Sequence, residues 1–484
     1  MRVQILDIVV FFVISVGTIL FGVTFARKNR NVSDYTSGGG NMPGFIVGMS
    51  IFATFVSSIS FLALPGSAYL GNWNSFVFSL SIPIAMFFAA KYFVPFYRNI
   101  ASISAYSFLE ERFGYWARAY AAICYLLTQI ARIGSILFLL GLALNSMLGW
   151  SIPSIIIITG IGVVIYSVLG GIKAVMWVDT IQGTILIFGA LISVLVLFFS
   201  LPGGIEQFFT IGKEYNKFSL GPFGSELNAP TFWVTLIYGL FINLQNYGID
   251  QNYVQRYKSA KSEKSAISSA LFGGLLYVPV SLLFFIIGTL LFVYYKVQPD
   301  LLPSVLAADQ VFPYFIVNGL PTGITGLLIA AVFSAGMSTI STSINSSATI
   351  ILTDFFEHKK KEIAERKRMK ILYATSFILG LLGIGVGLAM MSVQSALDAW
   401  WSLAGIFSGG MLGLFLLGYI TRRAKGVHAL LGAIFGVGLI AWMTLSKQTL
   451  FHNYLTIVFG TVLIFLVGFL ASYIITEKSK KQVE

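Results

Sequence analysis

The sequence predicts an all-α polytopic membrane protein, because of its composition, its long apolar runs and the placement of its basic residues. Of the 484 residues, 57% are hydrophobic and only 10% are charged, whereas soluble globular proteins carry about 25% charged residues. The mean hydropathy is +0.85. A chain of this composition is too apolar for a soluble domain, so we expect most of its helices to lie in lipid.

Thirteen apolar segments are predicted to cross the membrane, since a spanning helix needs about 20 residues. They cover roughly residues 6–26, 45–70, 73–97, 118–148, 153–168, 177–201, 232–255, 266–294, 323–352, 370–391, 396–419, 427–444 and 452–475. The first is expected to be a retained span rather than a signal peptide. It is too long for a signal-peptide core and lacks a small-residue cleavage pattern before its basic flank.

The basic residues predict the orientation of these spans. A net charge of +12 would suggest nucleic-acid binding in a soluble chain. Here, however, 24 of the 31 lysines and arginines fall in alternate loops that share one side of the membrane, and five fall on the other. Because cytoplasmic loops collect Lys and Arg, we expect the N-terminus outside, the C-terminus inside and no nucleic-acid partner. The basic run 358–370 is expected to be a solvated linker beside the lipid bilayer.

This topology predicts two inverted repeats. The five spans of residues 45–201 begin inside and the five of residues 232–419 begin outside, which is the arrangement of an inverted-repeat transporter. The halves share no convincing sequence identity. The remaining parts are an extra span and loop at 1–44, an extracellular loop at 202–231, and two spans with a cytoplasmic tail at 420–484.

The second span carries an unusual polar stretch, FATFVSSISFLALPG at residues 52–66. Its hydroxyls can bond their own helix one turn back or pack against a neighbouring helix. Three serines within four positions, followed by Pro65 and Gly66, favour a broken helix instead. A break frees carbonyl oxygens, which are tolerated at membrane depth where protein buries them and which can coordinate a cation.

A second polar cluster lies in the span of residues 323–352. Ser338, Ser341, Thr342 and Asn345 recur at spacings of three and four, so they share one face of a helix. A packing seam of small residues explains this stripe equally well. Together with the freed carbonyls of the second span, the stripe can complete a sodium site, because Na⁺ is a hard cation that suits oxygen ligands.

Arg132 lies in the middle of a span and cannot lose its charge, so it needs an anion beside it. One alternative is a permanent pair with Asp179, Asp250 or Asp398, of which Asp179 is the most embedded. The other is that Asp179 binds a cation beside Ser341 and Thr342, which leaves Arg132 free to hold a substrate carboxylate in a bidentate manner.

Enzymatic functions are not expected. The single cysteine, Cys124, cannot form an intrachain disulfide, and the three histidines lie apart at span ends. No nucleophile and base, metal cluster or phosphate loop is predicted at membrane depth.

These residues resemble the sodium:solute symporter family. The matching features are GGIKAV at 170–175 with DTIQ at 179–182, DQNYVQR at 250–256 followed by SAKS at 259–262, and NSSAT at 345–349 with Thr353 and Asp354. The broken second span is a further match. The resemblance implies a LeuT-like fold of five plus five helices and transport by alternating access.

The family's functional residues can be carried over by position. The sodium site implied for the whole family falls on the carbonyls of Ala53, Val56 and Ala335 and the hydroxyls of Ser338 and Thr339. A second sodium site, found in some members, would fall on Ser341, Thr342 and Asp179. The substrate pocket would draw on Ser57, Ser60, Arg132, Ser75, Ser79 and Asn243.

Among the branches of the family, the chain is most similar to the bacterial sialic-acid (N-acetylneuraminate) transporters, in which two hydroxyls and an arginine hold the carboxylate. Ser79 is a departure, because other sugar-carrying members have Glu or Gln there. The resemblance implies sodium-coupled import of a carboxylated sugar, with one or two Na⁺, across a bacterial cytoplasmic membrane. A symporter for another small acid or a neutral sugar, and a sensor that binds without transporting, are the alternatives.

Overall fold

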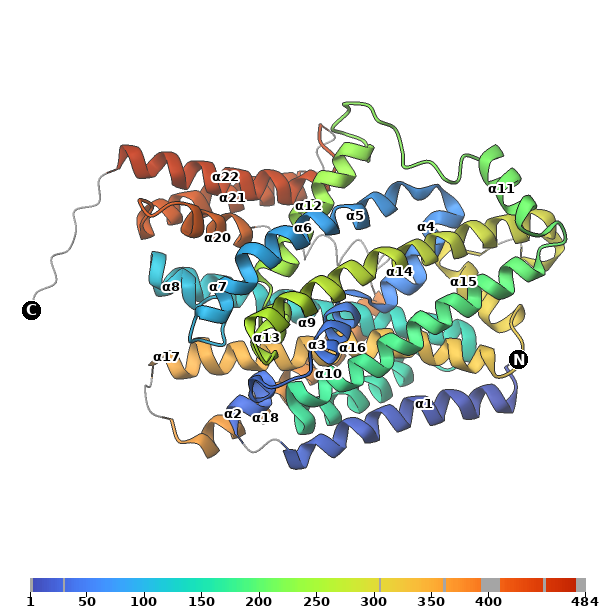
Figure 1. Cartoon of the computed structure of the whole chain (residues 1–484), viewed down its shortest axis with the longest axis horizontal. Helices are drawn as coiled ribbons and strands as arrows, with labels where there is room; N and C mark the ends of the chain where they lie inside the picture. The colour runs from blue at the N-terminus through green and yellow to red at the C-terminus, as the bar shows by residue number, and fades with distance from the viewer. Residues whose placement is uncertain are drawn as a thin grey trace, which may run out of the picture.

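The computed structural model describes residues 3–28, 31–303, 306–359, 363–392, 410–446 and 450–475. These residues form helices and no strands, and most of the long helices run in roughly the same direction (Figure 1). The helices are α1 (Ile5–Thr24), α2 (Val32–Ser37), α3 (Gly44–Phe55), α4 (Ser58–Leu70), α5 (Phe76–Leu80), α6 (Ile82–Phe88), α7 (Val94–Asn99), α8 (Ser107–Phe113), α9 (Tyr115–Leu148), α10 (Ile152–Ser200), α11 (Gly204–Glu214), α12 (Phe232–Ile249), α13 (Gln251–Ser259), α14 (Glu263–Val297), α15 (Ala308–Asn318), α16 (Ile324–Ile350), α17 (Glu357–Lys359), α18 (Glu365–Ala389), α20 (Met411–Ile420), α21 (Gly426–Leu445) and α22 (Leu455–Ile474).

The predicted class is confirmed, because the described chain is helical and rich in spans. Within the described residues, nine helical stretches are long and apolar enough to cross a membrane, and the bent pair of α3 and α4 makes a tenth if it counts as one span. The expected count of thirteen stays a prediction. Most of the predicted span at 396–419, including Asp398, lies outside the described residues.

Helix α10 contains two of the predicted spans. Its 49 residues would make a rod of about 74 Å at 1.5 Å per residue, more than twice the thickness of the hydrocarbon layer. The backbone leaves helical geometry at Gly171, where φ is 55°. An added Cβ there would lie 2.8 Å from the ring of Tyr35, so both conformation and space require glycine. Gly171 therefore separates the two predicted spans.

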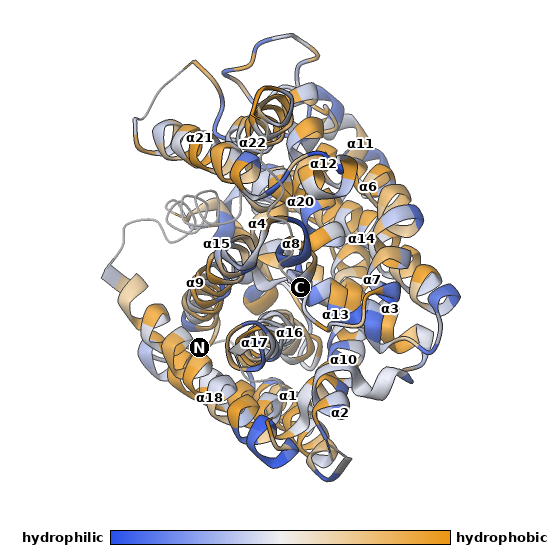
Figure 2. Cartoon of the chain, turned by 90° about the vertical axis from the view of Figure 1, so that its left-hand side faces the viewer, coloured by the Kyte–Doolittle hydropathy of each residue, from blue (hydrophilic) through white to orange (hydrophobic). Residues whose placement is uncertain are grey.

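Helix α16 is the most enclosed of these spans, with 89% of its most apolar stretch buried. It contacts α1, α9, α10, α13 and α18, and in the end-on view of Figure 2 it lies inside a ring of more apolar helices. Its serines and threonines face protein rather than lipid. Polar groups at membrane depth are tolerated in such surroundings.

The first helix holds the beginning of α16 in place. Asp7 on α1 is buried, and its Oδ1 accepts hydrogen bonds from the backbone amides of Gly323 at 2.6 Å and Gly326 at 3.0 Å. A carboxylate at a helix N-terminus satisfies free amides and interacts favourably with the helix dipole. Asp7 therefore caps the helix that carries the predicted sodium ligands.

Candidate functional site

The predicted helix break lies between α3 and α4. Val56 and Ser57 leave the helix, and the two helical segments meet at an angle of 52°. Ser57 begins α4, and its Oγ accepts a hydrogen bond from the amide of Ser60 at 3.4 Å. Pro65 does not cause the break, since it lies inside α4.

This break brings backbone oxygens against the hydroxyl-rich face of α16. Ser338 Oγ donates to the carbonyl of Ala53 at 3.1 Å and to that of Ala335 at 3.2 Å. Thr339 Oγ1 donates to the Ala335 carbonyl at 3.2 Å. Val56, the fifth residue of the predicted set, is buried and ends α3 with an extended backbone. The donor set is made of carbonyl and hydroxyl oxygens, which fit a hard cation such as Na⁺.

A second polar group surrounds Asp179, which lies on α10 and is fully buried. Its Oδ2 accepts hydrogen bonds from Ser50 Oγ at 2.6 Å and from Arg256 Nη2 at 2.9 Å. Its Oδ1 has no hydrogen-bond partner among the described residues. Arg256 Nη2 also donates to Thr342 Oγ1 at 2.7 Å, and Ser341 Oγ donates to the carbonyl three residues earlier. Two of the three residues predicted for a second sodium are thus bonded to one guanidinium.

Arg256 was not predicted at this site. It directly follows the predicted span of residues 232–255, and in the structure its side chain is fully buried on α13. The signal is present in the sequence as a polar stripe. Gln251, Asn252, Gln255, Arg256 and Ser259 recur with the period of a helix, and all of them are buried. A helix this polar can be buried only where other elements supply hydrogen-bond partners.

Arg132 lies beside the same helix break. Its guanidinium donates to the carbonyl of Thr54 at 3.3 Å. No described carboxylate lies within 4 Å of it, although Asp250 is close enough to interact electrostatically. The pairing of Arg132 with Asp179, one of the alternatives from the sequence, is therefore not observed, because Asp179 is bonded to Arg256. The fixed charge of Arg132 therefore lies against the end of α3, with no bonded carboxylate among the described residues.

The other predicted substrate residues make separate hydrogen bonds. Ser75 pairs with Ser67 of α4 at 3.2 Å, and Ser79 pairs with Ser281 of α14 at 2.8 Å. Asn243 of α12 donates to the hydroxyl of Ser81 at 2.9 Å, while its Oδ1 has no partner among the described residues. In this structure, no recorded hydrogen bond joins Ser75, Ser79 or Asn243 to Arg132.

The family model of the sodium:solute symporters matches residues 35–436. The chain belongs to the sodium:solute symporter family. The sodium/sialic acid symporter NanT of Aliivibrio fischeri is 33% identical over 93% of this chain and 90% of its own length. SiaT of Proteus mirabilis, also a sodium/sialic acid symporter, is 34% identical over 87% and 85%. The sodium-coupled monocarboxylate transporter 2 of Danio rerio is 31% identical over 91% and 72%.

Solved structures of symporters are also similar. A Na⁺-coupled sialic acid symporter in a substrate-bound, outward-open state superposes with a TM-score of 0.93 and 29% identity over 98% of both chains. Mhp1, a nucleobase-cation-symport-1 transporter, shares the fold with a TM-score of 0.61 and 17% identity over 92% and 95%. These relatives are secondary transporters, so the symporter described here is not expected to catalyse a chemical reaction.

Proposed function

We propose that the protein is a sodium-coupled symporter that imports sialic acid, or a closely related carboxylated sugar, by alternating access. The observation that carries this proposal is the helix break. There Ser338 donates to the carbonyl of Ala53, and Arg132 of α9 donates to the carbonyl of the next residue, Thr54, with no bonded carboxylate among the described residues. A cation site and an anion site on one hinge allow Na⁺ and a carboxylate to bind together. The names of the bacterial relatives supply the sugar acid as the substrate.

The sodium sites follow the predicted residues. The carbonyls of Ala53, Val56 and Ala335 and the hydroxyls of Ser338 and Thr339 would hold the first Na⁺. Ser341, Thr342 and Asp179 would hold a second. A carboxylate carried with one Na⁺ moves no net charge, whereas a second Na⁺ adds one charge, worth about 2.3 kcal/mol per 100 mV. That energy corresponds to roughly 50-fold more accumulation.

The substrate site is proposed at Arg132 with the hydroxyls of Ser57 and Ser60. Ser75, Ser79 and Asn243 would contact the rest of the sugar after rearranging their present hydrogen bonds. The bonds that join Ser75 and Ser79 to other serines are neutral and short-range, so a hydroxylated ligand can replace them without leaving a buried charge unpaired.

The proposed topology has thirteen spans, with the N-terminus outside and the C-terminus inside, because the positive-inside rule places the loops rich in Lys and Arg in the cytoplasm. The protein would lie in a bacterial cytoplasmic membrane, with residues 45–201 and 232–419 as the inverted repeats. All the loops that carry the cytoplasmic basic residues then lie on one side, together with α2, α8 and α17.

Uptake by proteoliposomes tests the proposal. We expect a sodium gradient to drive uptake of radiolabelled N-acetylneuraminate, and unlabelled monocarboxylates or neutral sugars to compete weakly. Changing Arg132→Ala should raise the half-saturating substrate concentration about 100-fold, because a lost hydrogen bond to a charged group costs about 1.5–3 kcal/mol. Lys91→Gln, which removes an exposed cation from another span, is the matched control.

Two results would contradict this assignment in different ways. If Arg132→Ala binds sialic acid within a few-fold of the parent, the arginine does not hold the carboxylate. If a monocarboxylate such as pyruvate is carried in preference to sialic acid, the substrate is a smaller acid, as the likeness to the Danio rerio transporter allows.

A further inference from the structure

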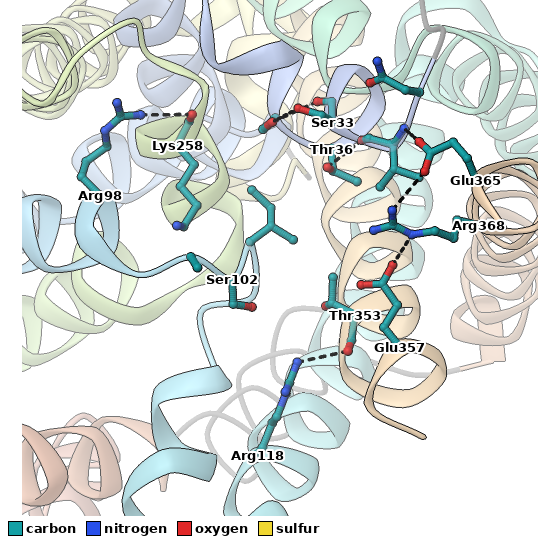
Figure 3. A pocket seen from close by; sticks show the side chains of 15 residues that line it. Ser33, Thr36, Arg98, Ser102, Arg118, Lys258, Thr353, Glu357, Glu365 and Arg368 are labelled. Carbon is teal, nitrogen blue, oxygen red and sulfur yellow. Dashed lines mark hydrogen bonds and ion pairs between the residues drawn. The ribbon is translucent and has the colours of Figure 1, made fainter. Parts of the chain in front are cut away.

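A cavity of about 570 Å³ lies away from the helix break, on the side predicted to be cytoplasmic. Its walls come from α2, the connection after α7, the end of α13 and the segment that follows α16 (Figure 3). Its size is within the range of small-molecule sites, about 300–1,000 Å³. Hydroxyl groups of Ser33, Ser37 and Ser102 are among those that line it.

Among the described residues, four cations line this cavity, and two of them are neutralised by carboxylates. Arg118 bonds Asp354 and Glu110, each at 2.7 Å. Arg368 bonds Glu357 at 2.6 Å and Glu365 at 3.0 Å. These two arginines have their counter-charges in the protein and do not need a ligand.

Arg98 and Lys258 differ, because neither has a described carboxylate within 4 Å. Arg98 donates through Nη1 alone, to the carbonyls of Tyr257 at 3.3 Å, Lys258 at 3.2 Å and Ala260 at 3.0 Å. The ammonium of Lys258 donates to one carbonyl, that of Ile100, at 2.5 Å. Figure 3 shows both side chains on one side of the cavity, across from Glu357 and Glu365. Both cations keep hydrogen-bond donors without a recorded partner in the described part of the chain.

Without a nearby carboxylate to stabilise it, the protonated form of Lys258 is less stable than it is in water. Burial, with a further contribution from the nearby charge of Arg98, lowers the pKa of Lys258 to about 8. An anion between the two side chains would reverse both effects, because it would supply the counter-charge that the protein lacks. The carboxylates across the cavity are already bonded to Arg368 and cannot do so.

We propose that Arg98 and Lys258 form a second binding site for the carboxylate of the transported substrate, on the cytoplasmic side, through which the substrate leaves. This site rests on the proposed function. A carboxylate that leaves Arg132 needs a cation at its next position, since an unpaired charge is costly outside bulk water. The serine hydroxyls that line the same cavity suit the hydroxyl groups of a sugar acid.

The position of Lys258 connects this site to the transport path. Lys258 follows Arg256 by two residues on α13, so the two side chains point to different sides of the helix. Arg256 holds the buried Asp179, while Lys258 lines the cavity. A movement of α13 that opens the cytoplasmic side would therefore bring the exit site and the cation sites into one path.

The test compares substrate affinity on the two sides of the membrane. Purified protein is reconstituted in vesicles of phosphatidylcholine alone, which removes anionic lipid headgroups as an alternative ligand. Sodium-driven uptake gives the external half-saturating concentration of N-acetylneuraminate, and efflux from loaded vesicles gives the internal one. Lys258→Gln is compared with Lys261→Gln, which changes an exposed lysine in the connection between α13 and α14.

We expect Lys258→Gln to raise the internal half-saturating concentration about tenfold, with the external one within twofold of the parent and Lys261→Gln unchanged. Inorganic phosphate inside the vesicles should inhibit efflux by the parent more than efflux by Lys258→Gln. An unchanged internal value, or equal increases on both sides, would overturn the exit site while leaving the symporter assignment intact. A parent protein that carries no carboxylate at all would refute the proposed function itself, and the exit site with it.

Discussion

The ion pair between Arg256 and Asp179 gives the sharpest test of a second sodium site. Both side chains are fully buried, with 2.9 Å between Arg256 Nη2 and Asp179 Oδ2. Removing one partner of a buried pair leaves the other charge uncompensated, which costs about 3–5 kcal/mol. If Na⁺ binds at Asp179, it can supply the missing positive charge. Arg256→Gln should therefore be much less stable than the parent in sodium-free buffer and should be rescued by sodium.

The size of the sodium effect follows from the contacts of Arg256. Its Nη2 donates to Asp179 and to Thr342, two of the proposed ligands. Hydrogen bonds to charged groups are worth about 1.5–3 kcal/mol each, and 1.4 kcal/mol is tenfold in affinity. In Arg256→Gln, sodium no longer has to compete with the guanidinium for the oxygens of Asp179 and Thr342. We therefore expect Arg256→Gln to bind the second sodium at least about tenfold more tightly than the parent.

The measurement is the melting temperature of the detergent-solubilised protein as choline is replaced by sodium at constant ionic strength. The double variant Asp179→Asn with Arg256→Gln removes both charges and should show only the sodium response of the first site. In uptake assays this double variant should lower the sodium Hill coefficient while substrate binding survives. Asp179→Asn alone is less informative, because it leaves Arg256 without a counter-charge. If the sodium responses of Arg256→Gln and the double variant are the same, no sodium binds at Asp179.

Two further predictions concern the face expected to be extracellular. Asp7→Ala should lower the free energy of unfolding by about 1–2 kcal/mol, because the cap of α16 is lost. Chemical denaturation measures this free energy, with the exposed Asp300→Ala as the control. Equal free energies of unfolding for the two variants would refute the cap. Lys217 donates to the carbonyl of Tyr69, in the last turn of α4, at 2.6 Å, and burial lowers the pKa of Lys217 from 10.5 to about 8. Between these pH values the unfolded chain holds the proton more strongly, so the folded state gains stability as the pH rises. As the pH rises through this window, the melting temperature of the parent should therefore rise relative to that of Lys217→Met. The control Lys213→Met should behave like the parent. A difference in melting temperature between parent and Lys217→Met that does not change with pH would contradict the lowered pKa of Lys217.

The helix break could be located from sequence, though one reason given for it was wrong. Hydroxyl groups near the middle of the span predicted it, and Ser57 does begin a new helix there. Pro65 was expected to contribute but is accommodated within α4, beside Gly288 of α14. Thr54 bonds the carbonyl of Ser50 at 2.7 Å, as expected for a hydroxyl that satisfies its own helix. The hydroxyl of Ser58, by contrast, is buried without a hydrogen-bond partner among the described residues.

The partner of Asp179 could not be found by the same reasoning. Hydropathy ended the predicted span at residue 255 and left Arg256 to the loop that follows, whereas the structure places residues 251–259 in the buried helix α13. Its burial depends on tertiary contacts with α3, α14 and α16, and these are invisible in a single sequence. The requirement that a buried charge has a counter-charge would have predicted a cation beside Asp179. A fully buried carboxylate needs a cation, and Arg256 follows a second helix break at Asp250.

The two helix breaks explain why cations and anions can be handled at membrane depth by so few charged residues. Each break ends a helix inside the protein, at Val56 and at Asp250, where backbone groups become available without exposure to lipid. Arg132 bonds a carbonyl beside the first break, and Arg256 lies in the helix that starts at the second. At the proposed sites, a Na⁺ beside Asp179 would supply the positive charge that Arg256 now supplies, and a carboxylate beside Arg132 would supply its missing counter-charge. If both solutes bind as proposed, they would change the charge balance at both helix breaks, which would couple the binding of one solute to that of the other.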